Sequence, residues 1–588
     1  MRLGVLVLVV VALLGFRVWV LQLVEGEKYR YQATLNYQKE VVVPALRGDI
    51  LDAQGRLLAA NRSRYDLVVD TGHYNTKVLH GSLWRLAPVL EQSPRELISA
   101  LERAPKVLGE AVLIANVSDD LRIKLLELQS ELPGLSVAEK ALRYYPNGVI
   151  GGHAVGYIQE VSARELERGL SSEYAAGDMI GRTGLEAAGE PWLRGKKGRK
   201  TVRVFASGVE DTRFYSDEIR PDDEKEVPGL TLQSHLDLDL QAHCEAILGA
   251  SIGSIVVLGA SGEVLALASY PRFDPNNLTD SRRRTIRENR NEFFGAIAGT
   301  WEPGSVYKMV VAYGGLLEGK INPRETVFCS GSIMRGKFKY TCMSKWGHGS
   351  VDMLTAIQKS CNVYFYTVGE RLGVDNLEKY SRMFSFGAPT GLDIPGETGG
   401  FIPSRAMKKA RFGGSRYHAY GEWLPGETLH SSIGQALTQV TPLQVAVYGH
   451  VLASRGQGYH PSLLWRVWDR DRLVHEFSPR PLDPMPVDER AFAVLDEGMW
   501  RVVNLPNGTA YKAHRPGLSV CGKTGSSEHP GSKTRGEPTH AWFVGYGPRE
   551  HPRYTVAVFL AKAGHGGEFA APLAMEVFER LLADALAS

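Results

Sequence analysis

The chain has 588 residues, enough for about three or four domains of ordinary size. Hydrophobic residues make up 44% and charged residues 23%, proportions that exclude a largely disordered chain and a polytopic membrane protein. The 68 Lys and Arg residues nearly balance the 65 Asp and Glu residues, and the resulting formal charge of +3 gives no indication of nucleic-acid binding.

The first 24 residues predict a membrane anchor. Residues 3–16 are apolar and uncharged, and after Arg17 the chain is apolar again as far as Val24, apart from Gln22. As a helix, residues 3–24 would span about 33 Å, enough to cross a hydrocarbon core of about 30 Å. A cleaved signal peptide is the alternative, but no small-residue cleavage site follows the segment. With Arg2 on the short side, the positive-inside rule predicts a single-pass membrane protein whose residues 25–588 lie outside the cytoplasm.

Residues 25–228 predict a mixed α/β extracytoplasmic domain. Alternating apolar residues and turn residues over 40–70 indicate short strands. The run from Ser93 to Glu96 fits a capping box at the start of a helix, and Ser118 fits the N-cap of a second helix. The charged residues 217–226 indicate a linker that ends this domain.

Residues 229–588 predict one α+β domain with an antiparallel sheet flanked by helices. Residues 255–258 and 264–268 are expected to form a hairpin, and 541–546 and 554–561 paired strands. Residues 572–587 are expected to form an amphipathic helix that begins at Pro572. The sheet would therefore be built from segments that lie far apart in the chain.

Three short motifs in this domain carry the chemistry. Ser305 and Lys308 stand one turn apart at the expected start of a helix, an arrangement that suits a nucleophile beside a base. Ser360 and Asn362 follow a helical pattern, and Lys523-Thr524-Gly525-Ser526 follows a strand-like run. Together the motifs match S-x-x-K, S-x-N and K-T-G in order.

With these motifs the chain resembles a class B penicillin-binding protein along nearly its whole length. Arg47-Gly48-Asp49-Ile50 and Gly184-Leu185-Glu186 resemble the signature of the family's elongated, non-catalytic pedestal domain. The run from Lys345 to Gly349 resembles the elongation-specific branch, penicillin-binding protein 2, more than the division-specific one. Two departures are Cys361 in the second motif, where the pattern has Asp, and Ser526, where Thr is common.

The resemblance implies a peptidoglycan D,D-transpeptidase that cross-links stem peptides during cell elongation and is a target of β-lactams. Ser305 would be the nucleophile and Lys308 its base, with no organic cofactor. Ser360 and Asn362 would relay protons and hold the substrate amide. Lys523 and Thr524 would bind the terminal carboxylate of the substrate. The backbone N–H groups of Ser305 and Ser526 would form the oxyanion hole, with Gly525 between Thr524 and Ser526.

The resemblance also implies partners for the anchor and the pedestal. These are a SEDS-family glycosyltransferase of the rod-shape elongation complex and other proteins of that complex. Alternatives within the fold are a division-type transpeptidase, a D,D-carboxypeptidase and a β-lactam sensor. A remote alternative is a P-loop NTPase, because residues 517–524 fit G-x-x-x-x-G-K-T, but no helix is expected directly after Thr524.

A second cluster of residues indicates a metal site. Cys329, Cys342, His348 and Cys361 fall close together in the sequence and are the right number of ligands for a closed tetrahedral zinc site. Some members of the elongation branch carry a zinc site in this region, which by resemblance favours structural zinc. A disulfide between Cys329 and Cys342, or free buried thiols, are the alternatives. The two remaining cysteines, Cys244 and Cys521, are expected to pack as small apolar side chains.

Overall fold

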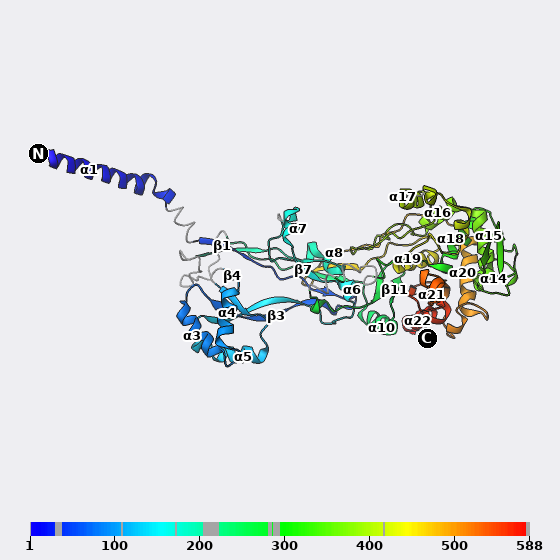
Figure 1. The fold of residues 1–588 in the computed structure, drawn as a ribbon, viewed down its shortest axis with the longest axis horizontal. Helices are drawn as coiled ribbons and strands as arrows, with labels where there is room; N and C mark the ends of the chain where they lie inside the picture. The colour runs from blue at the N-terminus through cyan, green and yellow to red at the C-terminus, as the bar shows by residue number, and fades with distance from the viewer. Residues whose placement is uncertain are drawn as a thin grey trace. The chain divides into compact units, whose positions relative to one another are not determined.

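The computed structural model describes residues 2–29, 38–107, 110–170, 173–203, 223–279, 285, 295–414 and 418–583. The chain divides into two compact units, drawn in Figure 1. The first contains Met1–Gly48, Ala60–Tyr144 and Arg194–Gly229, and the second contains Asp49–Ala59, Tyr145–Leu193 and Leu230–Ser588. Residues 217–222 of the expected linker lie outside the described residues.

The N-terminal segment is helical, as its composition predicts. An α-helix, α1 (Arg2–Trp19), continues into one π-helical turn, η1 (Val20–Val24). Its residues 7–24 have a mean hydropathy of 2.4 and none of them is buried, so by length and composition this helix can cross a membrane.

The first unit packs a small antiparallel sheet against helices. The long strand β3 (Leu57–Asp70), which belongs to this unit from Ala60 on, pairs with β6 (Leu135–Tyr144) and β5 (Glu110–Ile114), and β5 pairs with β4 (Lys106–Val107). The helices are α3 (Thr76–Leu86), α4 (Pro94–Arg103), α5 (Asp119–Glu127) and the short η2 (Gln129–Glu131). A separate ribbon joins β1 (Gln38–Val43) to β9 (Gly198–Arg203). Leucines from the helices and from β3 form the core of this unit.

The helix starts that the sequence predicts in this unit are confirmed. The Ser93 Oγ accepts a hydrogen bond from the Glu96 N–H at 3.3 Å, and the Glu96 carboxylate accepts one from the Ser93 N–H at 3.0 Å, which is a complete capping box for α4. The Ser118 Oγ accepts from the Leu121 N–H at 3.3 Å and caps α5.

The second unit begins with short elements. Strand β2 (Ile50–Leu51) pairs with β10 (Thr231–Ser234), which pairs with β17 (Leu464–Asp469), and β17 with β18 (Arg472–Glu476). A small hairpin joins β7 (Ile158–Glu160) to β8 (Met179–Gly181). The short helices here are α6 (Gly152–Val155), α7 (Ala163–Glu167), α8 (Gly184–Ala188) and α9 (Glu190–Leu193).

A five-stranded antiparallel sheet organises the rest of the second unit. Its order is β12 (Val264–Tyr270), β11 (Gly253–Gly259), β21 (Tyr554–Leu560), β20 (His540–Gly547) and β19 (Cys521–Ser527). Val544 of β20 packs on Gly449 of α19 (Pro442–Ala453), which covers one face. Helices α10 (Leu238–Leu248) and α22 (Gly566–Leu581) cover the other (Figure 1). Strands from both ends of this unit's sequence thus meet in one sheet, as predicted.

A helical layer carries the first two motifs. It contains η6 (Gly304–Tyr307), α13 (Lys308–Leu317), α14 (Met353–Gln358), α15 (Asn362–Leu372), α16 (Val374–Met383) and α20 (Glu489–Asn504). Between α13 and α14 lie two small ribbons, β13 (Val327–Cys329) with β16 (Gly349–Val351) and β14 (Ser332–Arg335) with β15 (Phe338–Thr341). The remaining elements are η5 (Pro275–Asn277), α17 (Arg405–Phe412), η7 (His418–Gly421), α18 (Pro425–Ser431), η8 (Tyr511–Ala513) and α21 (Pro530–Arg535).

Two predictions about the C-terminal part are corrected. Helix α22 begins at Gly566, so Pro572 lies inside it rather than at its start, because the preceding turn already packs on the sheet. The strand near the third motif begins at Cys521 and contains the motif itself, instead of ending before it. Lys523 and Thr524 therefore lie in a strand, and the next helix begins only at Pro530, an arrangement that excludes a P-loop.

Candidate active site

Ser305 lies on a tight helical turn at the floor of a cavity. The turn η6 leads directly into α13, so Ser305 and Lys308 both point from the first turns of one helical segment. Gly304 adopts φ +55°, and a Cβ there would lie 2.7 Å from the Ser526 carbonyl oxygen. Only glycine therefore lets the Ser305 turn approach the third motif this closely.

Lys308 is fully buried behind Ser305 and holds the second motif. Its Nζ donates hydrogen bonds to the Ser360 carbonyl oxygen at 2.8 Å, to the Ser360 Oγ at 3.1 Å and to the Asn362 Oδ1 at 2.7 Å. Burial lowers the pKa of Lys308 to about 8, although Cys342 and Cys361 act to raise it. An amine with this pKa is partly neutral near pH 7 and can accept a proton.

Ser360 lies between two lysines. Its Oγ accepts a hydrogen bond from the Lys523 Nζ at 3.0 Å on the side opposite Lys308. Burial, together with the charge of Lys308, lowers the pKa of Lys523 well below its ordinary value. Ser360 itself adopts φ +54°, a strained conformation for a residue with a side chain. This turn between α14 and α15 aims the hydroxyl at both amines.

The third motif supplies one wall of the cavity through its strand. Thr524 and Ser526 of β19 line the cavity, and the Thr524 hydroxyl forms a hydrogen bond with that of Thr509 at 2.6 Å. Between them a Cβ on Gly525 would lie 2.6 Å from the Pro303 carbonyl oxygen, so β19 packs tightly on the Ser305 turn. Lys523 is fully buried behind this wall and does not line the cavity, although it was expected to meet the substrate carboxylate.

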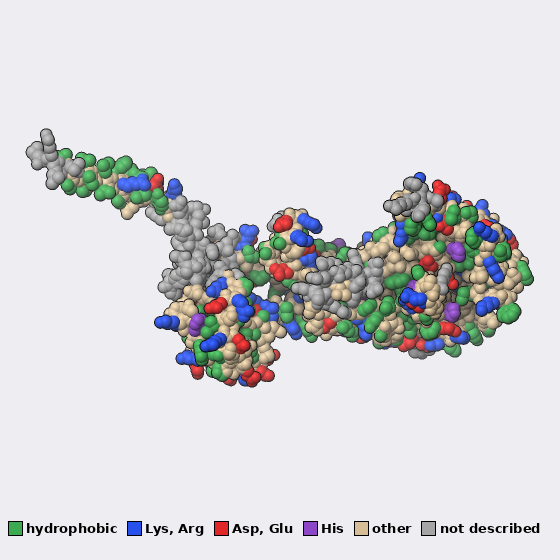
Figure 2. Space-filling model, viewed as in Figure 1, with side chains coloured by type: hydrophobic (Ala, Val, Ile, Leu, Met, Phe, Trp, Pro, Cys, Tyr) green, Lys and Arg blue, Asp and Glu red, His purple; other side chains and the backbone are tan. Residues whose placement is uncertain are grey.

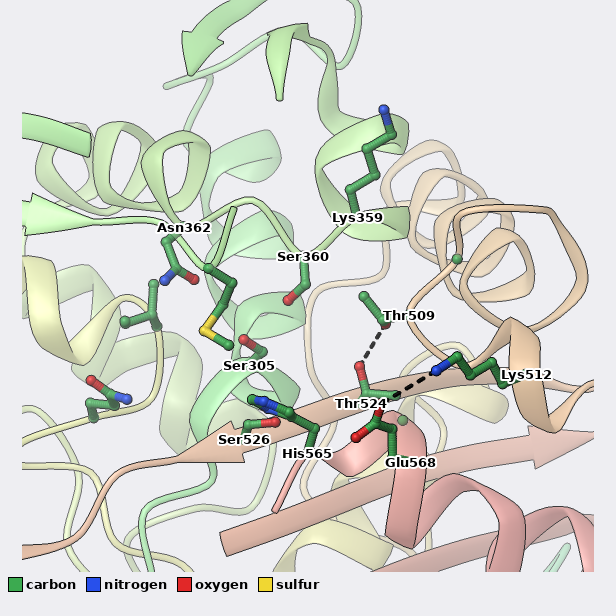
Figure 3. Close-up of a pocket in the computed structure, with 15 residues that line it drawn as sticks. Ser305, Lys359, Ser360, Asn362, Thr509, Lys512, Thr524, Ser526, His565 and Glu568 are labelled. Carbon is green, nitrogen blue, oxygen red and sulfur yellow. Dashed lines mark hydrogen bonds and ion pairs between the residues drawn. The ribbon is translucent and has the colours of Figure 1, made fainter. Parts of the chain in front are cut away.

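The cavity has a volume of about 310 Å³ and brings all three motifs together. Figure 3 shows Ser305, Ser360 and Ser526 pointing into one space, with Asn362 at its side. The full lining is Ser305, Met343, Lys359, Ser360, Asn362, Ile433, Gln435, Gly508, Thr509, Lys512, Thr524, Ser526, His565, Gly567 and Glu568.

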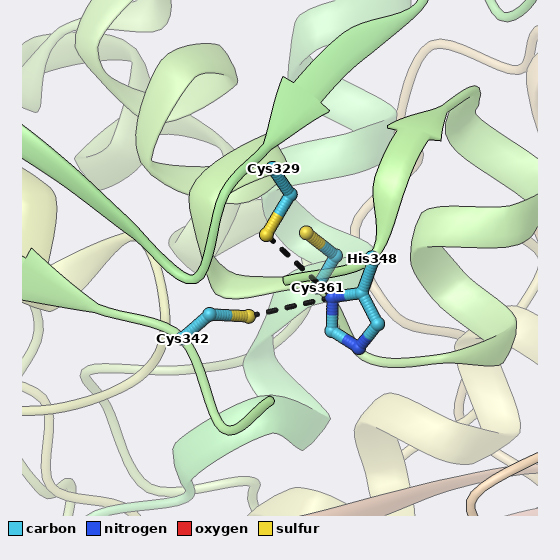
Figure 4. Close-up of side chains that lie close together, drawn as sticks. All are labelled: Cys329, Cys342, His348 and Cys361. Atoms are coloured by element: carbon cyan, nitrogen blue, oxygen red, sulfur yellow. Dashed lines mark hydrogen bonds between the residues drawn. The ribbon is translucent and has the colours of Figure 1, made fainter. Parts of the chain in front are cut away.

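The four predicted metal ligands also come together (Figure 4). The Nδ1 of His348 lies 3.7 Å from the Cys329 Sγ and 3.5 Å from the Cys342 Sγ, and all four ligand atoms lie within 4.8 Å of one another. The three cysteines are buried, and all five cysteines of the chain are free thiols. Hydrogen bonds from Cys361, His348 and the Asn362 N–H lower the pKa of Cys342, which favours a thiolate.

The arrangement of the three motifs matches a known family. The family described as "Penicillin binding protein transpeptidase domain" matches residues 253–582, and "Penicillin-binding Protein dimerisation domain" matches residues 42–227. The chain belongs to the penicillin-binding protein transpeptidase family.

Curated and structural relatives agree over nearly the full length of this penicillin-binding protein. The peptidoglycan D,D-transpeptidase MrdA of Haemophilus influenzae is 29% identical over 98% of this chain and 90% of its own. A chain from a structure titled "Structural coordination of polymerization and crosslinking by a peptidoglycan synthase complex" is 31% identical, with a TM-score of 0.73 over 98% of this chain and 97% of its own. The Helicobacter pylori PBP2 in complex with MreC matches in fold, with a TM-score of 0.78 at 24% identity over 93% of this chain and 99% of its own.

The structure adds residues to the site that the sequence of this penicillin-binding protein did not single out. Thr509 and Lys512 come from the turn around η8, and His565 and Glu568 from the start of α22. The Lys512 Nζ lies 3.3 Å from the Glu568 carboxylate at the cavity mouth. No local pattern marks these positions, because the fold alone brings the two segments beside β19.

Proposed function

We propose that this chain cross-links peptidoglycan with Ser305 as the nucleophile. The family and its relatives make the chain a serine-type peptidoglycan D,D-transpeptidase of the elongation type. One observation supports the residue assignment most: Ser305 and Ser360 both line the cavity, and the buried amines of Lys308 and Lys523 both donate hydrogen bonds to the Ser360 Oγ.

In the acylation step, the Ser305 Oγ attacks the carbonyl carbon of the D-Ala-D-Ala peptide bond. Neutral Lys308 accepts the hydroxyl proton, an ester bond forms and the C–N bond breaks. Ser360 passes a proton toward the departing D-Ala amine, because its hydroxyl lies within hydrogen-bond distance of both lysines. An amine of a second stem peptide then attacks the ester, releases Ser305 and completes the cross-link.

The backbone N–H groups of Ser305 and Ser526 form the oxyanion hole in this proposal. The close approach of Gly304 to the Ser526 backbone supports it. Loss of one such donor costs about 3–4 kcal/mol of transition-state stabilisation in serine hydrolases. The Thr524 hydroxyl binds the terminal carboxylate of the donor, and buried Lys523 holds the Ser360 hydroxyl through its hydrogen bond.

Product analysis tests this function. The full-length chain is incubated with uncross-linked glycan strands that carry pentapeptide stems, and the digested products are separated. We expect cross-linked dimers with the wild type and none with Ser305→Ala, while a control substitution of an exposed serine, Ser251→Ala, leaves the yield unchanged. Stems shortened by one residue without dimers would indicate a D,D-carboxypeptidase, and acylation by β-lactams with no turnover of stems would indicate a sensor.

The anchor and the first unit would serve assembly. The related chains were solved in a peptidoglycan synthase complex and in a complex with MreC, which supports partners of the elongation complex for this chain as well. We propose a SEDS-family glycosyltransferase as the main partner, bound through α1 and the first unit, with the second unit in the periplasm. Replacing α1 by an unrelated membrane helix should abolish co-purification of the glycosyltransferase and leave β-lactam acylation intact.

We further propose that Cys329, Cys342, His348 and Cys361 hold a structural zinc ion. A tetrahedral zinc with bonds of about 2.3 Å to sulfur and 2.0–2.1 Å to nitrogen separates sulfur from nitrogen by about 3.6 Å. The observed separations of 3.5 and 3.7 Å fit this geometry. Zinc would act as a cross-link that fixes the β13–β16 region to α15, where Asn362 begins. Native mass spectrometry of the full chain tests the stoichiometry.

A further inference from the structure

The segment between α13 and α14 exposes large apolar side chains to an unusual degree. Trp346 is 96% exposed and Met343 60%, and on the β14–β15 hairpin Phe338 and Met334 are 61% and 54% exposed. Single exposed hydrophobic residues are common on proteins, but a group of them on one small segment marks an interaction surface. Met334 pairs with Lys339, so these two side chains share one face of the hairpin, and Phe338 lies on the other face. We refer to Met334, Lys339, Met343, Lys345 and Trp346 as the platform.

The platform stands on a rigid base. The hairpin pairs in register from Ser332 with Thr341 to Arg335 with Phe338. The Thr341 carbonyl oxygen accepts hydrogen bonds from the Asn362 Nδ2 at 3.2 Å and from the Tyr366 hydroxyl at 3.3 Å. The turn after the hairpin packs on Gly331, where a Cβ would lie 2.5 Å from the Lys345 carbonyl oxygen. These contacts hold the backbone of the platform in place, so a ligand that binds it does not have to order the chain.

The platform is continuous with the active site. Met343 belongs to both, since it lines the cavity that contains Ser305 and Ser360. It directly follows Cys342, whose Sγ accepts a hydrogen bond from the N–H of catalytic-motif residue Asn362 at 3.3 Å. A substrate that reaches Ser305 along this side of the cavity therefore passes over Met343 toward Lys345 and Trp346.

The platform is also basic. Residues 326–351 contain Arg335, Lys337, Lys339 and Lys345 and no Asp or Glu. Arg335 is paired with Glu370, whereas Lys339 and Lys345 form no ion pair with any carboxylate that the structure describes. In the view of Figure 2, green and blue side chains lie next to one another over the region that carries α14 and α15 in Figure 1. A ligand for this surface combines apolar faces with negative charge.

We propose that the platform binds the peptidoglycan strand whose stem peptide occupies the cavity. The apolar C–H face of a sugar ring packs on the Trp346 indole, and carboxylates of the stem peptides pair with Lys339 and Lys345. The polymer is favoured over a protein or a lipid surface because the platform continues into the substrate cavity. This inference rests on the proposed function and adds a binding site for the polymer outside the catalytic residues.

The test compares Trp346→Ala with a matched control, Trp84→Ala, which removes another exposed tryptophan, 62% exposed, from the first unit. Binding of soluble glycan strands with pentapeptide stems is measured with the full-length chain in a Ser305→Ala background, which prevents turnover. We expect Trp346→Ala to weaken strand binding about tenfold, as truncation of a central aromatic residue commonly does. Trp84→Ala should bind as the parent does.

A second variant and a second readout keep the inference falsifiable. Lys345→Glu should weaken strand binding most at low salt, where exposed charges are least screened. In chains that keep the native Ser305, Trp346→Ala and Lys345→Glu should both be acylated by fluorescent penicillin like the wild type. Strand binding that is unchanged in both variants would overturn the inference, and so would a defect confined to a partner protein or to anionic lipid vesicles. Failure of the proposed function would look different, since chains that keep Ser305 would then form no cross-linked dimers from these strands, whatever their strand binding.

Discussion

Asn362→Asp tests whether Lys308 is the base. The substitution keeps the shape of the side chain and places a carboxylate where the amide oxygen now lies, 2.7 Å from the Lys308 Nζ. It also removes the hydrogen bond from the Asn362 Nδ2 to the Thr341 carbonyl oxygen. A carboxylate this close raises the pKa of a lysine by at least about one unit. Burial sets the pKa of Lys308 at about 8 in the wild type, so the substitution should move it to 9 or above.

The magnitude follows from the fraction of neutral Lys308. With a pKa of about 8, about 9% of the amine is neutral at pH 7, about half at pH 8 and about 90% at pH 9. Wild-type acylation should therefore rise about fivefold from pH 7 to pH 8 and less than about twofold from pH 8 to pH 9. With a pKa of about 9, only about 1% is neutral at pH 7, so the variant should be about tenfold slower there and recover at high pH.

The assay is the second-order rate of acylation by a fluorescent penicillin, which reports the pKa of the free enzyme. Lys308→Arg, whose guanidinium stays charged, should not be acylated at any pH. Thermal unfolding of each variant separates a lost base from a lost fold. A wild-type profile that is flat from pH 6 to pH 9, or an Asn362→Asp profile with an unchanged midpoint, would refute the assignment of Lys308 as the base.

Three further substitutions test other parts of the structure. Gly304→Ala places a Cβ 2.7 Å from the Ser526 carbonyl oxygen at a residue with φ +55°, so the Ser305 turn must shift. Penicillin acylation should then fall about 100-fold, because a displacement of a reacting group by about 1 Å can cost that much in rate. Cys342→Ser should lower the zinc content and the melting temperature of the full chain, whereas Cys244→Ala should keep the zinc. Ser93→Ala removes the N-cap of α4, and loss of such a cap destabilises a helix by about 1 kcal/mol. Hydrogen-exchange protection of the α4 amides should therefore fall about fivefold.

Each of these has an outcome that contradicts it. Acylation of Gly304→Ala at the wild-type rate would show that the turn tolerates a side chain. Equal zinc content in the Cys342→Ser and wild-type chains, measured by native mass spectrometry, would remove that residue from the ligand set. Unchanged hydrogen-exchange protection of the α4 amides in Ser93→Ala would show that the Ser93 hydroxyl stabilises the helix no better than a water molecule in its place.

The catalytic motifs were predictable because each is local. Ser305 and Lys308 lie one turn apart, and the chain between Ser360 and Asn362 turns from one helix into the next within three residues. Residue type and spacing therefore indicate their chemistry before any tertiary contact is known. The capping box of α4, the N-cap of α5 and the β11–β12 hairpin were predictable for the same reason.

The features that sequence reasoning missed depend on tertiary contacts. Thr509 and His565 enter the cavity only because η8 and α22 pack beside β19. The direction of the Lys523 side chain also depends on the pleat of β19, which turns it toward Ser360 while Thr524 lines the cavity, and its role in binding the substrate carboxylate stays a prediction. The Cys/His cluster was predicted from four ligand residues that lie close together in the sequence and from the family resemblance, whereas its geometry depends on two ribbons and the start of α15 meeting at one point.

The most direct test of the account is covalent labelling of the full-length chain with fluorescent penicillin, followed by mass spectrometry of the labelled peptide. We expect one acyl group, located on Ser305, and no label on Ser305→Ala. A label on another residue, or an undiminished label on Ser305→Ala, would contradict the assignment of Ser305 as the nucleophile.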